Sequence, residues 1–370
     1  YKQCRIGDIY AERSRRGASD MELLSVTMND GVMPRSEIEG KDNSSEDKSN
    51  YKIVRKGDMV YNSMRMWQGA NGISPCDGIV SPAYTVLMPK QEINNGYFAA
   101  LFKSANLINE FRKNSQGMTS DTWNLKYPQI ETIKVQVPSV SEQDKVSELF
   151  GVLDARIVAQ AQLIEALKKY KRGVNNQILS QIDNSYNCRL GSVCEIVGGG
   201  TPDTLHTEYW GNTVEWFTPS EIGKTKYVNN SVRKLSDIGL DNSSAKLLPI
   251  GTVLLTTRAT LGEMSIAKRE CSTNQGFQSL IPHTDRVSSE YLYYMQIIIK
   301  PWCEKYASGN TFREISKSAL SDCIIPIPDR ARQEQIVKLL SSIDMLIGAA
   351  ESISMSLSKI RHGLMQQLFI

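Results

Sequence analysis

Two long stretches of the chain carry apolar residues at alternating steps of four and three. They run from Ser141 to about Gln181 and from Ala331 to Ile370. Because this spacing is the heptad pattern of packed helices, it predicts two long helices that form a coiled coil. The apolar seam positions are Val146, Phe150, Leu153, Ile157, Ile164, Leu167, Val174 and Ile178 in the first stretch, and Ile336, Leu340, Ile343, Ile347, Ala350, Leu357, Leu364 and Leu368 in the second.

Polar residues interrupt both seams. Gln160 and Lys171 occupy seam positions in the first stretch, and Ser354 and Arg361 do so in the second. Such residues lower the stability of a coiled coil but can fix its register. Two unrelated amphipathic core helices are the alternative, but the matched length and register favour packing of the stretches against each other.

The remaining sequence alternates between strand and helix patterns. Residues 133–137 alternate apolar and polar side chains, as a half-buried strand does. Residues 96–114 and 288–306 have helical apolar spacing, and clusters such as 42–45 and 241–244 are rich in turn-forming residues. We therefore expect mixed α and β structure outside the two long helices.

The chain consists of two diverged copies of one plan. Residues 4–7 reappear as 188–191, residues 51–58 match 245–252, and the segment from Gly69 to Pro89 matches that from Gly262 to Pro282. From Leu125 onward a constant shift of 190 pairs, in order, Pro138, Gln143, Asp154 and Gly173 with Pro328, Gln333, Asp344 and Gly363.

These patterns predict an α+β protein with two mixed α/β domains, each followed by a long helix. The expected segments are a first domain at 1–140, a first helix at 141–182, a second domain at 183–330 and a second helix at 331–370. A pseudo-two-fold axis is the simplest way to let the seams face each other in equivalent surroundings. We therefore expect the helices to be antiparallel.

Composition narrows the function without defining it. The 370 residues carry a net charge of +3 with 41% hydrophobic and 22% charged residues, which is ordinary for a globular protein and only weakly suggests nucleic acid. Seven cysteines without a C-x-x-C pair and three widely separated histidines indicate reduced thiols in a cytoplasm and no metal site. Neither a transmembrane run nor an N-terminal signal segment is expected, and the missing initiator Met suggests that a few residues were trimmed.

Three features in combination carry a resemblance to a known family. One is the strand-to-helix junction at 137–143 with its partner at 327–333, where a proline precedes a glutamine. Another is the helix end at 167–173, echoed at 357–369, and the third is the Gly-Gly-Gly-Thr-Pro segment at 198–202. With these features the chain resembles the specificity subunit of type I restriction-modification enzymes. It departs from the family pattern at Arg332, where Glu is expected, and in the first domain, which lacks the Gly-Gly-Thr-Pro segment.

The resemblance implies a non-catalytic subunit that needs no cofactor. Each domain would read one half of a split double-stranded DNA target, and the helices would act as a ruler between the halves. The implied partners are two methyltransferase subunits and, in the full complex, restriction subunits.

Two short motifs resemble catalytic sequences but do not complete them. Residues 81–84, Ser-Pro-Ala-Tyr, lack the second proline of the amino-methyltransferase tetrapeptide that holds a flipped base. Residues 223–225, Gly-Lys-Thr, resemble the end of a phosphate-binding loop, but Thr218 stands where that loop needs glycine. We interpret the first motif as a structural turn and predict no catalytic residues.

Basic and amide-rich loops are the better candidates for DNA contact. Arg and Lys neutralise phosphates, Arg also reads guanine, and Asn or Gln reads adenine. The candidates in the first domain are Arg13, Arg15 and Arg16; Arg65, Trp67, Gln68 and Asn71; and Lys113, Gln116, Thr119, Trp123 and Asn124. Those in the second domain are Lys224 and Lys226; Arg258 and Thr260; Lys268, Arg269, Asn274 and Gln275; and Asn310, Thr311 and Arg313.

Two other functions fit the sequence less well. One is a stand-alone DNA-modifying enzyme with duplicated domains, which binding of a methyl donor by the isolated chain would reveal. The other is a coiled-coil structural protein, which would show no salt-dependent binding of duplex DNA.

Overall fold

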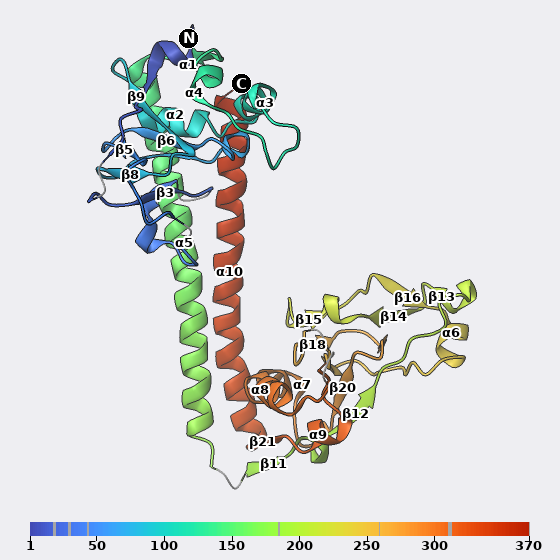
Figure 1. Ribbon diagram of the computed structural model, residues 1–370. Helices are drawn as coiled ribbons and strands as arrows, with labels where there is room; N and C mark the ends of the chain where they lie inside the picture. Colours follow the sequence, from blue (N-terminus) through green and yellow to red (C-terminus); the bar gives the residue numbers. More distant parts are fainter. Residues whose placement is uncertain are drawn as a thin grey trace. The chain divides into compact units, whose positions relative to one another are not determined.

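The computed structural model describes residues 1–17, 20–28, 31–42, 44–183, 186–258, 260–309 and 313–369. The chain divides into two compact units (Figure 1). Unit 1 comprises Tyr1–Leu163 and Ala350–Ile370, and unit 2 comprises Ile164–Ala349. The two long helices, α5 (Val140–Ser180) and α10 (Arg330–Leu368), each contribute one part to each unit.

The globular part of unit 1 is built on a four-stranded sheet in the order β2-β9-β6-β7, with the two-stranded pairs β1-β10, β3-β4 and β5-β8. Its strands are β1 (Lys2–Arg5), β2 (Tyr10–Glu12), β3 (Leu24–Val26), β4 (Val32–Pro34), β5 (Lys52–Val54), β6 (Met59–Asn62), β7 (Asn71–Ile73), β8 (Gly78–Val80), β9 (Tyr84–Pro89) and β10 (Lys134–Val137). Its short helices are α1 (Ile6–Ile9), η1 (Arg35–Glu37), η2 (Met66–Gln68), α2 (Asn95–Leu101), α3 (Ala105–Asn114) and α4 (Tyr127–Ile130).

The globular part of unit 2 has a five-stranded sheet in the order β12-β20-β17-β18-β15, a four-stranded sheet β13-β16-β14-β19, and the pair β11-β21. Its strands are β11 (Asn187–Arg189), β12 (Cys194–Gly198), β13 (Trp210–Gly211), β14 (Val214–Phe217), β15 (Tyr227–Val228), β16 (Arg233–Leu235), β17 (Val253–Leu255), β18 (Met264–Ala267), β19 (Cys271–Thr273), β20 (Gln278–Pro282) and β21 (Ile324–Pro326). Its short helices are η4 (Leu190–Ser192), η5 (Thr207–Tyr209), η6 (Pro219–Glu221), α6 (Asp237–Asp241), α7 (Ser289–Tyr294), α8 (Gln296–Tyr306) and α9 (Lys317–Ser321).

Backbone geometry confirms the internal repeat. The paired glycines Gly57 and Gly251 both have positive φ, 91° and 87°. Equivalent loops are also held by the same backbone hydrogen bond: Ser63 N–H donates to the Ala83 carbonyl at 3.3 Å, and Thr257 N–H donates to the Gly276 carbonyl at 2.8 Å. The predicted helical spacings at 96–114 and 288–306 each correspond to two consecutive helices, α2 with α3 and α7 with α8.

A buried glutamine joins each globular part to the start of its long helix. Gln143 is 2% exposed; its amide donates to the Pro138 carbonyl at 3.0 Å, and its side-chain oxygen accepts from Asn94 N–H at 2.9 Å. Gln333 repeats this arrangement, with Pro328 at 2.9 Å and Ser288 N–H at 3.1 Å. The glutamine of the sequence motif therefore satisfies backbone groups on both sides of the junction.

The first turn of each helix is capped by a different residue. Ser139 and Glu142 cap α5 reciprocally, since Ser139 N–H donates to the Glu142 carboxylate at 3.1 Å and Glu142 N–H donates to Ser139 Oγ at 3.4 Å. At α10 the Asp329 carboxylate accepts from Arg332 N–H at 2.8 Å. The aspartate cap explains how the second copy begins its helix with Arg332 in place of Glu.

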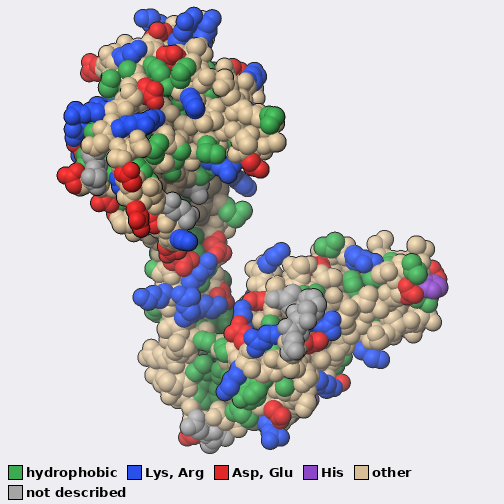
Figure 2. Space-filling model, viewed as in Figure 1, with side chains coloured by type: hydrophobic (Ala, Val, Ile, Leu, Met, Phe, Trp, Pro, Cys, Tyr) green, Lys and Arg blue, Asp and Glu red, His purple; other side chains and the backbone are tan. Residues whose placement is uncertain are grey.

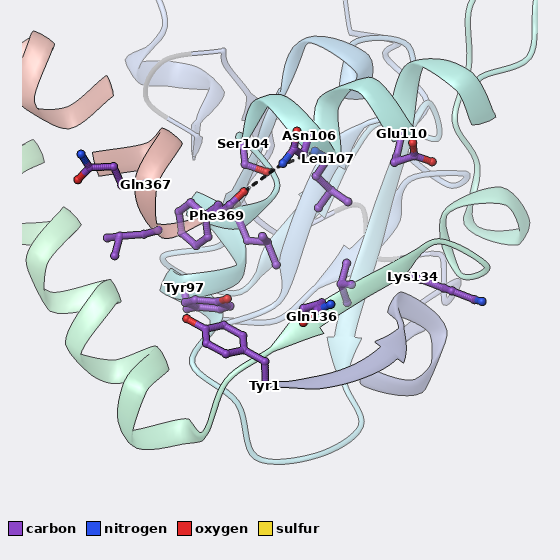
Figure 3. A pocket seen from close by; sticks show the side chains of 13 residues that line it. Tyr1, Tyr97, Ser104, Asn106, Leu107, Glu110, Lys134, Gln136, Gln367 and Phe369 are labelled. Carbon is purple, nitrogen blue, oxygen red and sulfur yellow. Dashed lines mark hydrogen bonds between the residues drawn. The ribbon is translucent and has the colours of Figure 1, made fainter. Parts of the chain in front are cut away.

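In unit 1 the start of α5 packs against the end of α10, so the two helices are antiparallel there. The Phe150 and Phe369 rings stack with centroids 5.8 Å apart. Figure 3 shows that Phe369 also lies beside Tyr97, while Asn106 donates to the Phe369 carbonyl at 3.5 Å. Phe150, Met365 and Phe369 belong to the same core as α2 and α3, so both helices complete the core of the globular part.

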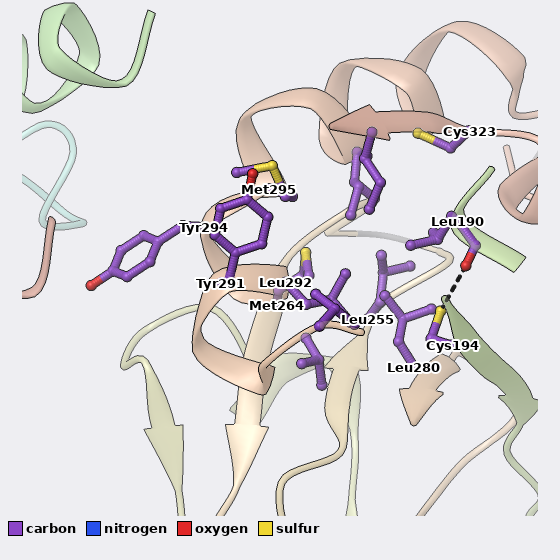
Figure 4. Close-up of a cluster of buried hydrophobic side chains, with 14 of the residues drawn as sticks. Leu190, Cys194, Leu255, Met264, Leu280, Tyr291, Leu292, Tyr294, Met295 and Cys323 are labelled. Atoms are coloured by element: carbon purple, nitrogen blue, oxygen red, sulfur yellow. Dashed lines mark hydrogen bonds between the residues drawn. The ribbon is translucent and has the colours of Figure 1, made fainter. Parts of the chain in front are cut away.

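In unit 2 the end of α5 packs against the start of α10, again antiparallel. Ile178 of α5 and Ile336, Leu340 and Ile343 of α10 join the large core of the globular part. Figure 4 shows part of that core, where the Cys194 thiol donates to the Leu190 carbonyl at 3.2 Å. The helices are therefore not isolated amphipathic elements, and every predicted seam residue is buried or half-buried.

Residues related by the 190-residue shift make equivalent polar contacts across the seam. In unit 1 Arg361 pairs with Asp154 at 2.5 Å, and in unit 2 the repeat equivalents Lys171 and Asp344 pair at 2.5 Å. Gln160, 4% exposed, donates to the carbonyl of its own repeat equivalent, Ala350, at 2.9 Å. Three of the four predicted polar interruptions thus make specific contacts with the opposite helix.

The junction glutamine should contribute measurably to stability. Gln143→Ala leaves a buried N–H and a buried carbonyl without partners, so we expect unit 1 to lose about 2–4 kcal/mol. Hydrogen exchange read by mass spectrometry separates unit 1 amides from those of unit 2. Gln162→Ala, which removes an exposed glutamine from the same helix, is the matched control. Equal exchange in the two variants would contradict the role assigned to Gln143.

Candidate nucleic-acid interface

Two of the predicted loops in unit 1 meet at a pair of tryptophans. Trp67, on η2, and Trp123 make an edge-to-face contact with ring centroids 5.2 Å apart. The Arg112 guanidinium, at the end of α3, lies 5.8 Å from the Trp67 ring, within cation–π range. The Trp67–Trp123 contact brings the predicted 65–68 and 113–124 clusters together. Arg65 is exposed and Gln68 half-exposed beside Trp67.

The loop after α3 is held together by hydrogen bonds at its base, and the side chains at its tip are exposed. Gln116 and Asn124 exchange two backbone hydrogen bonds of 3.0 and 2.8 Å, and Thr122 closes a turn onto Thr119. Gln116 and Thr119 are exposed, and Met118 between them is 100% exposed. Lys113 is also exposed and pairs with Glu110 at 2.7 Å. The loop therefore presents polar and apolar side chains on a constrained backbone.

Other predicted residues of the first domain have structural roles. Arg13 forms a two-point ion pair with Asp58, at 2.6 and 3.1 Å, and the Asp58 side chain is only 5% exposed. The hydrogen bond to Asp58 raises the pKa of Arg13 further. Asn71 is fully buried and donates to the Gly69 carbonyl at 3.0 Å, so it does not reach the surface. Arg15 and Arg16 are exposed, as expected of phosphate contacts.

The Ser81–Tyr84 motif forms a turn, as predicted. Tyr84 N–H donates to the Ser81 carbonyl at 2.9 Å, and Ala83 N–H donates to Ser81 Oγ at 3.3 Å. In unit 2 the equivalent turn at Asn274 is closed by the Asn274 side chain, which accepts from Gly276 N–H at 2.9 Å. These interactions support a structural role for both turns and leave the Asn274 side-chain oxygen engaged within its own loop.

The glycine-rich segment of unit 2 is fitted against that turn. A Cβ on Gly199 would lie 2.0 Å from the Asn274 carbonyl, so only glycine permits this approach. The segment then places Thr201 where its hydroxyl hydrogen-bonds the exposed Gln275 side chain. The Gly-Gly-Thr-Pro motif thus holds the side chain of Gln275, which the sequence predicts as a DNA contact.

A second pair of loops meets in unit 2. Arg258 pairs with Glu314 at 2.9 Å, and Thr257 also donates to Glu314, at 3.3 Å. Thr260 is exposed on the same loop, and the Arg313 guanidinium donates to the Glu304 carbonyl. Glu314 therefore links Thr257 and Arg258 to the backbone at Ser308, with which Glu314 exchanges two hydrogen bonds. The predicted contacts Asn310 and Thr311 lie outside the described residues.

The remaining candidates of the second domain differ in exposure. Lys224 is exposed, Lys268 lies 4.7 Å from the Tyr227 ring, and Arg269 donates to the Asn229 side chain at 3.0 Å. Lys226 is half-buried: its ammonium group lies 4.4 Å from the Tyr294 ring and donates to Ser341 of α10 at 3.1 Å. Burial lowers the pKa of Lys226, which joins the globular part to the helix within unit 2.

Sequence reasoning missed several residues that shape these surfaces. Arg112 was not among the candidates because it lies in the segment predicted to be helical. Its position near the end of that helix, α3, was the signal that could have identified it. Met118 lay between two polar candidates but is apolar, and Thr201 and Glu314 act through partners 74 and 57 residues away. No local pattern reveals such pairings.

The rest of the described chain supplies further limits. Its helices lack the combination of length and apolar character needed to cross a membrane. Within the same residues, no group of three or more His, Cys, Asp and Glu side chains is placed to hold a metal ion. Figure 2 shows Lys and Arg side chains interspersed with Asp and Glu on the visible face.

Comparison with known proteins establishes the family. A family model described as the type I restriction modification DNA specificity domain matches residues 2–169 and again residues 183–355. The chain belongs to this family. The two matches coincide with the two copies of the repeat, so each copy is one specificity domain together with most of its long helix.

Relatives and solved structures agree with this placement. The MjaIX specificity subunit of Methanocaldococcus jannaschii is 35% identical over 186 residues, 49% of this chain and 43% of that protein. The EcoR124I/EcoR124II specificity subunit of Escherichia coli is 26% identical over 231 residues, 58% and 56% of the two chains. The chain thus spans about half the length of these relatives. The S subunit structure from M. genitalium shares the fold, with a TM-score of 0.60, 14% identity and coverage of 100% and 96%.

Replacing Arg13 and Arg15 should separate a structural arginine from a surface one. Arg13→Ala leaves the buried Asp58 carboxylate without its cationic partner, so we expect a loss of about 3 kcal/mol. Arg15→Ala removes an exposed side chain and should change stability by no more than about 0.5 kcal/mol. Urea unfolding of both variants measures the difference. Equal stabilities would show that the Arg13–Asp58 pair is not structural.

Proposed function

We propose that the chain is the DNA-reading specificity subunit of a type I restriction-modification complex, and that it reads a bipartite target in double-stranded DNA. The observation that carries the proposal is the duplicated specificity domain, with a loop surface in each copy and an antiparallel helix pair shared by both units. Because both copies have the same backbone framework, we expect each copy to bind DNA in the same orientation through its own loop surface.

The two surfaces differ in chemistry, which supports two different half-sites. Unit 1 presents the Trp67–Trp123 pair with Arg112 and the exposed Met118. Unit 2 presents Gln275, held by Thr201, and Thr257 and Arg258, which both contact Glu314. Amide and guanidinium groups read purines, whereas apolar side chains contact the thymine methyl group. A target of two unlike halves therefore fits better than a palindrome.

The helix pair is the candidate ruler between the halves. An unbroken helix of 41 residues, such as α5, is about 60 Å long. The Asp154–Arg361 and Lys171–Asp344 pairs are related by the repeat, and Gln160 contacts its own repeat equivalent, Ala350. These polar contacts would hold one register and hence one separation of the recognition domains.

Exposed apolar side chains on the helices offer docking positions for the methyltransferase subunits. Leu149 and Leu339 are repeat equivalents, 40% and 44% exposed, and Tyr170 and Ile360 form another such pair, 59% and 52% exposed. Contiguous exposed apolar patches mark interaction surfaces, and the recurrence of these side chains at equivalent positions is what singles them out here. Two equivalent surfaces fit two copies of one methyltransferase subunit, with restriction subunits joining the full complex.

We assign catalysis to those partners and not to this chain. The Ser81–Tyr84 turn is engaged in backbone contacts, and its repeat equivalent has an unrelated sequence. In this proposal the chain is a scaffold that needs no cofactor of its own and acts on DNA in the cytoplasm. The segments 1–140, 141–182, 183–330 and 331–370 would then be reader, spacer, reader and spacer.

Exchange of one recognition domain tests the proposal. Replacing residues 1–137 with those of a relative keeps β1 and β10 from one parent, since these strands pair with each other. In cells that contain the methyltransferase partner, we expect sequencing of methylated DNA to show one altered half-site and one unchanged half-site. The matched exchange of residues 187–326 should alter the other half.

Two results would contradict the proposal. If either exchange altered both halves, the domains would not be independent readers. If a folded wild-type complex produced no methylated motif, the chain would not be a specificity subunit.

A further inference from the structure

Each unit contains a recess between its globular part and the long helices. The unit 1 recess, about 1200 Å³, is lined by Lys103, Arg112, Asp154, Ile157, Arg361 and His362, among others. The unit 2 recess, about 750 Å³, is lined by Lys171, Arg172, Lys224, Lys300, Asp344 and Ile347, among others. The 190-residue shift relates the helix residues of the two recesses, so the same hollow is built twice.

The same ion pair borders both recesses. Asp154 with Arg361 in unit 1 and Asp344 with Lys171 in unit 2 have equivalent positions and equal distances of 2.5 Å. These pairs belong to the helix seam and neutralise their own charges. Ile157 and Ile347 also correspond, so the ionic and apolar parts of the helix wall are both repeated.

Both recesses carry an excess of positive charge. In unit 2 five Lys and Arg side chains and three carboxylates line the hollow, and one of the five cations, Lys168, pairs with Glu165 outside it at 3.9 Å. In unit 1 three Lys and Arg side chains and one carboxylate line the hollow, not counting His362. Lys300 pairs with Glu263 at 2.5 Å, but Arg172 and Lys224 are exposed and take part in no ion pair among the described residues. Cations left unpaired in a concave surface attract an anionic ligand.

The unit 1 recess adjoins the candidate reading surface. Arg112 lines the recess and also lies over Trp67, which contacts Trp123 at the base of the 115–124 loop. A polymer that reaches those loops can therefore continue into the recess without leaving the protein surface. This continuity favours a polyanion over a small free anion.

We infer that each recess holds the sugar–phosphate backbone of the DNA that leaves a half-site toward the unread gap. The inference rests on the proposed function, because it assumes that the recognition loops bind duplex DNA. Phosphate contacts position a protein on DNA without reading its sequence. Arg172 and Lys224 would thus add affinity and orientation but no choice of bases.

The test uses the complex of the full chain with its methyltransferase subunits. Arg172→Ala combined with Lys224→Ala removes the two unpaired cations, and Lys169→Ala combined with Lys317→Ala removes two exposed cations that do not line the recess. We expect only the first pair of changes to weaken binding, about tenfold on cognate and unrelated duplexes alike. The slope of log K against log salt should become shallower by about two.

A chemical change in the DNA identifies the contacted group. Methylphosphonates placed in the part of the gap next to the half-site that unit 2 reads remove phosphate charge there, so they should weaken wild-type binding and have little further effect on the Arg172→Ala, Lys224→Ala variant. The methylated motif in cells should stay unchanged.

Three results would overturn the inference while leaving the proposed function intact. They are an unchanged salt slope, an altered motif, or loss of methyltransferase subunits from the complex on size-exclusion chromatography. The last result would identify the recess as a protein-docking surface. Failure of the proposed function is distinct, since the wild-type complex itself would then methylate no bipartite motif.

Discussion

Burial of apolar side chains from both long helices in each globular core is the interaction on which the molecule depends. In unit 1 the core takes Phe150 from the helix of its own copy and Phe369 from the helix of the other copy. In unit 2 it takes Leu340 from its own helix and Ile178 from the other. Neither copy can complete its core alone, because removing the other helix would expose buried apolar surface. The duplication is therefore one interdependent structure.

Because each core includes residues from both long helices, the packing of the helices also positions the two globular parts that carry the candidate DNA-binding loops. Gln143 and Gln333 join each recognition domain to its helix, and polar pairs such as Asp154–Arg361 hold the helices in one register. Apolar packing alone tolerates slippage along a seam, whereas a buried amide such as Gln160 requires a partner at a fixed position. Under the proposed function, the choice of DNA sequence would belong to the loops, which can diverge without disturbing the helices and their register.

The sequence predicted the frame better than the surfaces. Heptad spacing and a constant shift of 190 are periodic signals, and the structure confirms the helices, their seam and the repeat. Surface roles depend on contacts between distant residues, which no local pattern contains. Arg13 pairs with Asp58, 45 positions away, and Lys226 reaches Ser341, 115 positions away, so polarity alone misjudged their availability. Arg112 was overlooked because it lies within a segment predicted to be helical, whereas the candidates were sought in loops.

We propose that the helix seam sets the distance between two DNA-reading domains. Inserting four residues after Gln160 and four after Ala350 lengthens both helices at repeat-equivalent positions, by about 6 Å at 1.5 Å per residue. In cells with the methyltransferase partner, the gap in the methylated motif should then grow by about one or two base pairs, at about 3.4 Å each. Both half-sites should keep their sequence. A folded variant that methylates the original motif with its original gap would show that the helices are not the ruler.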